Sequence, residues 1–406
     1  MINSIAWRNI WRNRVRSLIV LSAVAIGIFA GVFSTGFYLG MADMRFKTAI
    51  KTEFSHIRIQ QKQFQAEPSI GLFVDGSQNI LNQLKKIPEI EGASGRLTCE
   101  AMAETAHGNL GVKLTGVEPE DEKKVSDIHE KLIEGNYFTG KKGRIPQIIV
   151  GSGLAEDLKL KLKSKLKITL TDINGNVNAR LYKVSGIYKS NNTTYDKLNV
   201  FVVRDEFLEQ SALSDNVSHL IAVYLKQGAD AELVATQLRK TYPELEVLTW
   251  RNISKELALM ADQMNQLMYI FLVIIMLALC FGIINTMLMA VLERKRELGM
   301  LMAVGMSKFR VFRMIILESV YLSLTGGVAG IIIGFASIKY FEKHPLKVDM
   351  FSGFEMYGYP KEVATILPSE SLVSMTIMVI FLGILSAIYP ALKAIRYNPA
   401  ETIRDE

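Results

Sequence analysis

Few residues of this 406-residue chain have the types and spacing that catalysis or metal binding requires. Gly151-Ser152-Gly153 follows a stretch typical of a strand and precedes one typical of a helix, which is the context of a nucleophile elbow or a phosphate loop. The segment lacks the spacing G-x-S-x-G, and the pattern G-x-x-x-x-G-K-[ST] occurs nowhere in the chain, so a helix N-cap explains Ser152 better. The five histidines lack the paired spacing of metal ligands; they are His56, His107, His129, His219 and His344. We therefore predict no catalytic residue, no metal site and no cofactor bound by this chain.

One carboxylate, Glu318, lies inside an otherwise apolar run, just over a helical turn after Arg313. A charged side chain at the centre of a membrane helix costs about 2.5–3.5 kcal/mol on insertion scales, which would fit a proton or ion site. Because no other carboxylate could form a relay with it, we favour a residue near the interface that finds a partner on a neighbouring helix or reaches toward water.

The segment Glu293–Gly305 has the pattern of a helix that docks onto another protein. It opens with five consecutive charged residues and then becomes apolar and small. A topology signal would need only the basic residues, whereas here Leu298, Leu301 and Met302 share one helical face. A helix on the membrane surface is the weaker alternative. The predicted docking residues are Glu293, Arg294, Arg296, Glu297, Leu298, Gly299, Met302, Ala303 and Gly305.

Four apolar runs must position these segments, and each has the roughly 20 residues that a helix needs to cross a bilayer. They are Ser17–Tyr38, Leu267–Val291, Met314–Ile338 and Leu372–Tyr389. Arg and Lys cluster before the first run, between the second and third, and after the fourth, and the positive-inside rule places these segments in the cytoplasm. Both termini are then cytoplasmic, and Gly40–Gln266 and Phe341–Ser371 lie outside.

The composition agrees with a membrane protein that also has a water-facing domain. Hydrophobic residues make up 49% of the chain, too many for an average soluble enzyme, yet 21% are charged. The net charge of +7 gathers beside the spans, where membrane lipids are a simpler partner than nucleic acid. The first run is longer than the apolar part of a signal peptide, and Ile2–Val15 before it is typical of an amphipathic helix with Trp7 and Trp11 at the interface, so we expect an uncleaved anchor.

The segment between the first two runs is predicted to be an α+β domain. Its two ends, about 53–106 and 216–252, each have a strand–helix–strand pattern, and two such units pair into an antiparallel sheet with helices on one face. The middle, about 107–215, is mostly strand and forms an inserted β-rich subdomain, with Asn174-Gly175 as a hairpin turn. The fold class is therefore an α-helical membrane protein with four transmembrane helices, one before and three after a large α+β extracytoplasmic domain.

The predicted divisions follow the order of the chain. They are residues 1–16 (cytoplasmic amphipathic helix), 17–39 (first transmembrane helix), 40–266 (extracytoplasmic domain), 267–292 (second transmembrane helix), 293–308 (cytoplasmic docking helix), 311–338 (third transmembrane helix), 341–371 (extracytoplasmic loop), 372–392 (fourth transmembrane helix) and 393–406 (cytoplasmic tail). Because neither Pro nor Gly interrupts 253–266, the second helix should run from Ile253 to Glu293, about 60 Å, and connect membrane and domain rigidly.

Two patterns on these helices leave alternatives open. Small residues four apart allow close helix contact, either within the chain or between subunits; they are Gly27, Gly31, Gly326, Gly330 and Gly334. An apolar stripe follows the extracytoplasmic ends of the first two helices, and core packing is the favoured explanation over an adaptable substrate groove. The stripe consists of Phe33, Phe37, Met41, Met44, Met260, Met264 and Met268.

The segment Glu293–Gly305 resembles E-R-x-x-E-[IL]-G-x-x-x-A-x-G of the FtsX-like permease family, the membrane subunits of type VII ABC transporters typified by MacB, LolC and LolE. The matching residues are Glu293, Arg294, Glu297, Leu298, Gly299, Ala303 and Gly305. The C-terminal stretch Tyr389–Arg404, the basic N-terminal helix, Glu134–Phe138 and Val150–Ala155 are also similar to the family. The resemblance covers essentially the whole chain.

The resemblance implies a homodimer or heterodimer of permeases in the bacterial inner membrane, with its large domain in the periplasm. A separate ATP-binding-cassette ATPase would bind ATP and Mg²⁺, and Glu293–Gly305 would be the coupling helix that receives its motion. The expected function is lipoprotein release from the membrane. The alternatives are MacB-like efflux of antibiotics or peptides, or an FtsX-like scaffold that controls a cell-wall hydrolase as its periplasmic partner. LolC lengthens the turn that here is only Asp172–Asn178 into a chaperone-binding hook.

Overall fold

The computed structural model describes residues 7–8, 10–12, 14–138, 143–348, 359, 362–367 and 369–396. The chain divides into two compact units. The helical unit comprises Met1–Ala42, Asp262–Lys347 and Glu362–Glu406, and the sheet unit comprises Asp43–Ala261 and Val348–Lys361. The predicted tail beyond residue 396 and, within the predicted loop 341–371, residues 349–358, 360–361 and 368 lie outside the described residues.

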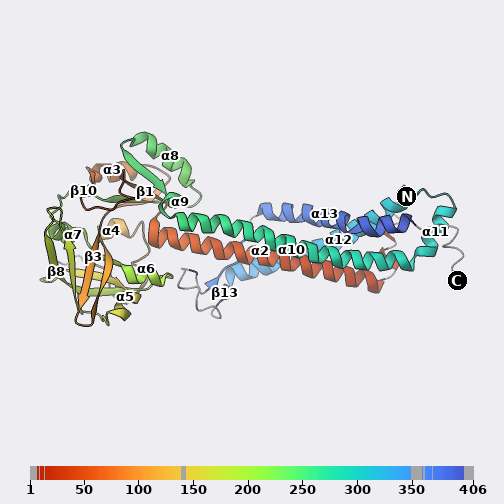
Figure 1. Ribbon diagram of the computed structural model, residues 1–406, viewed down its shortest axis with the longest axis horizontal. Helices are drawn as coiled ribbons and strands as arrows, with labels where there is room; N and C mark the ends of the chain where they lie inside the picture. Colours follow the sequence, from red (N-terminus) through yellow and green to blue (C-terminus); the bar gives the residue numbers. More distant parts are fainter. Residues whose placement is uncertain are drawn as a thin grey trace. The chain divides into compact units, whose positions relative to one another are not determined.

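Long apolar helices build the helical unit (Figure 1). They are α2 (Arg14–Thr48), α10 (Lys255–Glu293), α12 (Lys308–Lys343) and α13 (Ser369–Ile395), and the short helix α11 (Lys295–Ala303) follows α10. Within the described residues, four helices are long and apolar enough to cross a membrane. The absence of Pro and Gly lets α10 begin at Lys255, two residues after the expected start.

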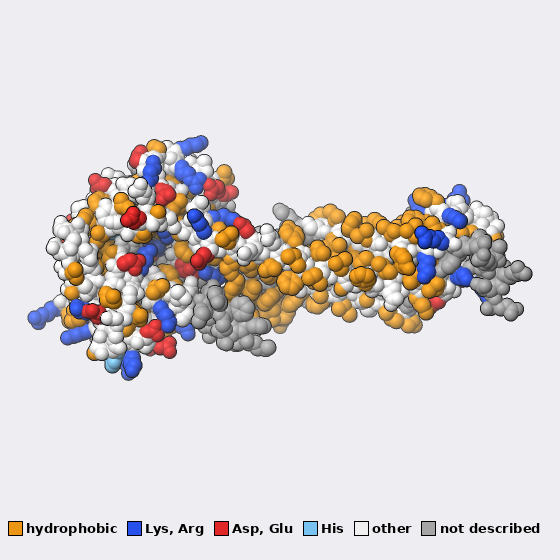
Figure 2. Space-filling model, viewed as in Figure 1, with side chains coloured by type: hydrophobic (Ala, Val, Ile, Leu, Met, Phe, Trp, Pro, Cys, Tyr) orange, Lys and Arg blue, Asp and Glu red, His pale blue; other side chains and the backbone are white. Residues whose placement is uncertain are grey.

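The four long helices differ in how much apolar surface they bury inside the chain. Of the most apolar 18 residues, 44% are buried in α12 and in α13, but only 6% in α10. Figure 2 shows the resulting apolar surface of the helical unit, with Lys and Arg at the end near α11. The exposed surface of α10 therefore needs a lipid or protein environment.

Glycines set the distance between α12 and α2. A Cβ atom added to Gly326 would lie 2.9 Å from the Leu21 carbonyl oxygen, and one added to Gly330 would lie 2.5 Å from that of Ala25. One added to Gly334 would lie 2.7 Å from Val32 Cγ1. These three glycines thus serve a close contact within the chain, which is one of the two roles that the spacing left open.

The remaining two glycines of the pattern face α10. A Cβ atom on Gly27 would lie 2.2 Å from Leu279 Cδ2, so the two helices meet closely there. At Gly31 the nearest atom is Ile275 Cγ2 at 3.9 Å, so the helices diverge within one turn. The two faces of α2 therefore pack differently against α12 and α10.

One half of the sheet unit is an antiparallel sheet in the order β12-β1-β11-β3. Its strands are β1 (Ile57–Gln61), β3 (Ile90–Thr105), β11 (Leu220–Leu225) and β12 (Leu245–Thr249), and the helices α3 (Ser77–Leu84) and α8 (Ala231–Thr241) pack with them in one core. Two strand–helix–strand units thus interlock in a ferredoxin-like order, because each contributes one central and one outer strand.

The other half of the sheet unit is a closed barrel, which sequence patterns did not predict. β3 pairs with β11 through Arg96 and with β4 (Gly108–Val117) from Leu97 onward. The pairing continues through β9 (Asn199–Val203), β6 (Gln147–Gly151), β8 (Val177–Tyr188) and β7 (Lys165–Thr171), which returns to β3. Leu97, Leu114 and Ile148 are among the buried side chains that fill the interior.

Short elements complete the two units. They are η1 (Ala49–Phe54), β2 (Val74–Asp75), α4 (Pro119–Glu122), β5 (Leu132–Gly135), α5 (Ser152–Asp157), α6 (Thr193–Leu198), α7 (Arg204–Ser211), β10 (Val217–Ser218), α9 (Trp250–Ile253), β13 (Leu346–Lys347) and β14 (Glu362–Val363).

Gly330→Ala should destabilise the helical unit by about 1–3 kcal/mol, because the new methyl group would force α12 away from the backbone of α2. Gly282→Ala on α10 is the matched control, since a Cβ atom there meets nothing within 4 Å. It should be neutral or stabilise by up to about 1 kcal/mol through helix propensity. Thermal unfolding of the two purified variants in detergent measures the difference, and equal melting temperatures would contradict the packing role of Gly330.

Candidate coupling site and apolar pocket

The segment predicted to dock onto a partner forms α11, and its C-terminal end is fixed by backbone geometry. Met306 N–H donates to the Leu301 carbonyl at 2.9 Å and Gly305 N–H to that of Met302 at 3.1 Å, the paired bonds of a Schellman motif. Gly305 has a φ of +103°, which favours glycine. The Gly305 of the sequence pattern therefore ends the helix.

Four charged side chains of alternating sign join α11 to two other segments. Arg12 Nη2 donates to both Glu297 carboxylate oxygens, at 2.6 and 2.8 Å. Arg294 Nε donates to Glu297 at 3.2 Å, and Arg294 Nη1 donates to Glu318 on α12 at 3.3 Å. This charge chain, Arg12–Glu297–Arg294–Glu318, links the N-terminal segment, α11 and α12.

The two ends of the charge chain have different environments. The Arg294 and Glu318 side chains are 15% and 10% exposed, so their attraction is little screened by water. Arg12 and Glu297 are half-exposed and their pair adds little stability. The hydrogen bond from Arg12 nevertheless lowers the pKa of Glu297, and Arg294 adds to this effect. Glu318 thus has the partner on a neighbouring segment that we favoured.

The structure corrects which face of α11 can meet a partner. Leu298 is only 2% exposed and packs in the core of the helical unit, with Leu301 and Met302 partly buried against the same core. The apolar face expected to dock thus packs on its own chain, because sequence periodicity does not distinguish an internal contact from an external one. The exposed apolar side chains are Met300, Val304 (89%) and Phe309 (72%).

The other predicted docking residues divide between the two sides of α11. Gly299 is buried beside Leu298, whereas Glu293, Arg296, Ala303 and Gly305 are exposed. Val304 and Phe309 were not predicted. The sequence does show an apolar residue, Val304, directly before the glycine that ends α11, and another, Phe309, at the second position of α12.

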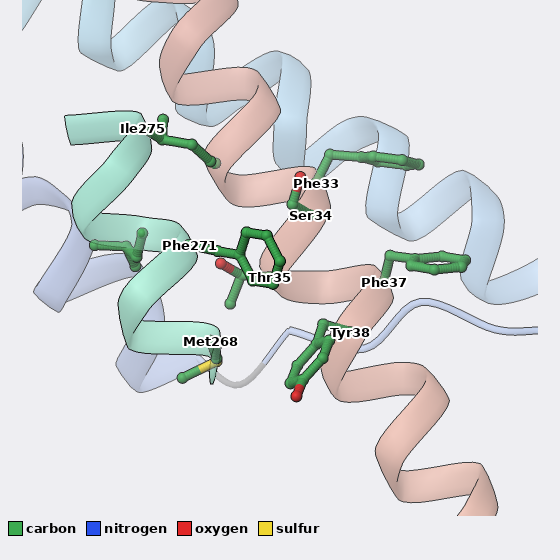
Figure 3. Close-up of a pocket in the computed structure, with 10 residues that line it drawn as sticks. Phe33, Ser34, Thr35, Phe37, Tyr38, Met268, Phe271 and Ile275 are labelled. Atoms are coloured by element: carbon green, nitrogen blue, oxygen red, sulfur yellow. The ribbon is translucent and has the colours of Figure 1, made fainter. Parts of the chain in front are cut away.

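A pocket of about 280 Å³ lies between α2 and α10 of the helical unit. Its lining consists of Gly31, Phe33, Ser34, Thr35, Phe37, Tyr38, Met268, Phe271, Leu272 and Ile275. Figure 3 shows Thr35, Tyr38, Met268 and Phe271 in the space between the two helices, whereas the rings of Phe33 and Phe37 point to the other side of α2. The ring of Phe33 packs against Phe341 of α12 at 5.7 Å between centroids.

The pocket contains only part of the predicted apolar stripe. Phe33, Phe37 and Met268 line it, while Met264 is buried elsewhere in the helical unit. Met41 is not among its lining residues, and Met44 and Met260 belong to the sheet unit. Phe271 and Ile275 were missed, although they follow Met268 at three and seven residues, on the same helical face.

Other sequence candidates have structural explanations. The N-cap of α5 is Gly151, not Ser152, whose hydroxyl donates to the Asp196 carboxylate at 3.2 Å. His219 is fully buried and accepts a hydrogen bond from the Thr98 N–H at 2.8 Å through Nδ1, and burial lowers its pKa. Within the described residues, no group of three or more His, Cys, Asp or Glu side chains is placed to hold a metal ion.

The hairpin that Asn174-Gly175 predicted joins β7 to β8. Asp172 accepts hydrogen bonds from the backbone N–H groups of Asn174 at 2.9 Å and Asn176 at 2.8 Å. Gly175 has a φ of +84°. The turn is thus closed by its own polar groups.

The long apolar helices and the α/β domain between the first two of them define a class, that of helical membrane proteins with a large inserted domain. Residues 269–399 match the FtsX-like permease C-terminal family, and residues 17–241 match the MacB-like periplasmic core domain. The chain belongs to the FtsX-like permeases that carry a MacB-like periplasmic core domain.

Three relatives align over almost their full lengths. The lipoprotein-releasing system transmembrane protein LolC of Buchnera aphidicola is 23% identical over 410 residues, covering 98% of this chain and 96% of LolC. LolE of Haemophilus influenzae is 23% identical over 422 residues, 98% of each chain. An ABC transporter permease of Methanocaldococcus jannaschii, MJ1507, is 24% identical over 427 residues, covering 100% of this chain and 98% of that one.

Arg294→Met should destabilise the helical unit by about 3 kcal/mol, because it removes the arginine from the buried Glu318. Adding Glu318→Gln to that variant should recover much of the loss, since a neutral amide costs less to bury. Arg296→Met, at an exposed position of the same helix, is the control. Thermal unfolding in detergent measures the stability of each variant. A loss of stability in Arg294→Met no larger than that in Arg296→Met would contradict the buried charge pair.

Proposed function

We propose that this chain is the permease subunit of a type VII ABC transporter and couples ATP hydrolysis by a separate ATPase subunit to movement of its sheet unit. Family membership and the full-length alignment with proteins named LolC and LolE support this assignment. The P-loop pattern occurs nowhere in the 406 residues, which supports an ATPase on another chain that binds ATP and Mg²⁺.

We further propose the membrane topology that the charged flanks indicate. The helices α2, α10, α12 and α13 cross the inner membrane, both termini and α11 are cytoplasmic, and the sheet unit is periplasmic. The MacB-like periplasmic core match over residues 17–241 supports that side for the sheet unit. A second permease subunit, identical or related, covers part of the exposed apolar surface of α10.

The charge chain is the observation that carries the coupling role of α11. A force applied to the exposed side chains Met300, Val304 and Phe309 reaches Glu318 on α12 through Arg294, whose contacts hold α11 against the bundle. A surface loop without such contacts would absorb the same force by moving. The ATPase therefore meets the side of α11 opposite Leu298.

Val304→Asp should uncouple the transporter, because a charge in the centre of the apolar docking face must be desolvated when the ATPase binds. Leu233→Asp, at an apolar side chain of similar exposure on α8, is the control. We expect Val304→Asp to lower recovery of the co-expressed ATPase with the affinity-purified permease at least ten-fold and to abolish transport-dependent ATP hydrolysis. Normal recovery and hydrolysis would exclude this face as the ATPase contact.

The pocket between α2 and α10 supports an amphipathic substrate. Apolar side chains form most of its wall, and the hydroxyl groups of Ser34, Thr35 and Tyr38 supply a few polar atoms. Such a site accommodates an acyl chain whose polar end remains near water. We therefore propose lipoprotein, the substrate in the names of LolC and LolE, as the cargo.

Gly31→Leu should reduce lipoprotein release several-fold, because the new side chain would extend into the pocket, where the nearest atom to a Cβ lies 3.9 Å away. Gly282→Leu adds the same side chain to an open surface of α10 and should leave release unchanged. Release of a purified lipoprotein from proteoliposomes that contain the permease and its ATPase measures both. Full release by Gly31→Leu would remove the pocket from the transport path.

Efflux of an antibiotic or peptide is the second candidate, and the MacB-like core domain and the tight β7–β8 turn favour it. A turn closed at Asp172 leaves no room there for the chaperone hook that the family resemblance gives to LolC. The same proteoliposomes discriminate the two functions. Drug or peptide transport without lipoprotein release would establish efflux, and activation of a cell-wall hydrolase without either would establish an FtsX-like scaffold.

A further inference from the structure

A second cavity, of about 370 Å³, opens in the sheet unit and has a different chemistry. Arg58 of β1, Thr98 and Glu100 of β3, Lys113 of β4 and Phe64 are among its lining residues. Ile57 and Ile59 belong to the core under α3 and α8, so the intervening Arg58 projects from the opposite face of β1. The cavity thus lies on the side of the sheet that these two helices leave uncovered.

Two cations, Arg58 and Lys113, line this cavity, and a third, Arg96, lies close enough for its charge to act on both; among the described residues only Arg96 has a carboxylate partner. Arg96 donates to both oxygens of Glu122, at 2.6 and 3.1 Å. Arg58 makes one hydrogen bond, from Nη1 to Gln65 Oε1 at 3.3 Å, and its buried Nε has no partner among the described residues. In the described part of the chain, the charges of Arg58 and Lys113 therefore lack a carboxylate at hydrogen-bond distance.

Of these two cations, Lys113 has the fewer polar contacts. Its ammonium group has no hydrogen bond or ion pair within the part of the chain that the structure describes, although Glu100 is its cross-strand neighbour. Burial lowers the pKa of Lys113 to about 8, and the positive charges of Arg58 and Arg96 add to this effect. Burial and Arg96 likewise lower the pKa of Arg58 to about 10. The protein surroundings alone therefore disfavour the charged forms of Lys113 and Arg58, and a bound anion would offset this cost.

We infer that this cavity binds a phosphate group carried by a small molecule. The three N–H donors of Lys113, the Nε–H of Arg58 and the hydroxyl groups of Ser69 and Thr98 exceed what the two oxygens of a carboxylate accept. The volume is that of a small-molecule site, and Phe64 and Ile70 give the rest of the ligand an apolar wall. The phosphate can come from a phospholipid headgroup or from a free phosphate compound.

The site lies one side chain from the beginning of α10. Gln65 accepts from Arg58 through Oε1 and donates through Nε2 to the Ile253 carbonyl at 3.1 Å. Ile253 ends α9, and α10 begins two residues later at Lys255. A ligand that binds Arg58 thus competes with Gln65, the side chain that also donates to the Ile253 carbonyl just before this helix.

Isothermal titration of the purified full-length chain in phosphate-free detergent tests the site with inorganic phosphate, glycerol 3-phosphate and acetate. The wild type should bind both phosphates at least ten-fold more tightly than acetate. Tighter binding of glycerol 3-phosphate would identify a lipid headgroup as the source, and equal binding a free phosphate. No phosphate binding, or equal affinity for acetate, would overturn the inference.

Lys113→Met and Arg58→Met should each weaken phosphate binding at least ten-fold, whereas Lys165→Met, at an exposed position of β7, should not. The melting temperature of unliganded Lys113→Met separates this effect from misfolding. It should equal or exceed that of the wild type, because the substitution removes a buried charge without a partner. Unchanged phosphate affinity in a folded Lys113→Met variant would exclude the site.

The affinity should also depend on pH through Lys113. The charged and titratable groups around it are Arg58 of β1, Arg96, Glu100 and Cys99 of β3, and burial raises the pKa of Cys99 to about 12. Deprotonation of Lys113 above its pKa of about 8 removes one of the binding charges, so phosphate affinity should fall about ten-fold between pH 7 and pH 9. Lys113→Met should lack this fall, and an identical pH profile in both proteins would contradict the role of Lys113.

Discussion

The pairing of β1 with β12 is the constraint on which the arrangement of the sheet unit depends. β1 follows α2 and η1 directly, and β12 leads through α9 into α10. The two strands pair antiparallel from Ile57↔Thr249 to Gln61↔Leu245, so the two chain ends of the inserted domain must meet at one place. Phe46 and Trp250 pack there at 5.7 Å between ring centroids.

Polar contacts tie the end of the first helix to the barrel side of the same unit. Thr52 in η1 donates to Asp127 at 2.8 Å, and the Tyr195 hydroxyl donates to the Thr52 carbonyl at 3.1 Å. Glu53 accepts from Arg45 at 3.3 Å and from Asn192 at 3.1 Å. The buried Arg45–Glu53 pair favours this geometry, because displacing either side chain would leave a buried charge without its ion-pair partner. Thr52 and Glu53 both lie in the π-helical turn η1.

Sequence patterns predicted the features that arise from local periodicity. The length of α10, the two strand–helix–strand ends of the sheet unit and the Asn174-Gly175 turn all follow from neighbouring residues. The barrel does not, because its closure depends on β3 pairing with β7, some 65 residues later in the chain. The docking face at Leu298 was misassigned for a related reason, since an apolar helical face does not specify its partner. The spacing of the glycines also does not indicate which helix Gly330 contacts. In the structure it is α2, whose Ala25 carbonyl oxygen lies closest to Gly330.

The two faces of α2 explain how a force on α11 could reach the apolar pocket. On one face, Gly326 and Gly330 bring α12 against the backbone of α2, so the contact between these two helices is tightly packed. On the other, the contact with α10 loosens from Gly27 to Gly31 and opens into the pocket. Arg294 follows the last residue of α10 and is bound to Glu318 of α12. In the proposed coupling, a displacement of α11 would therefore act on α10 and α12 together, and the loosest contact within their reach is the one between α2 and α10 at the pocket.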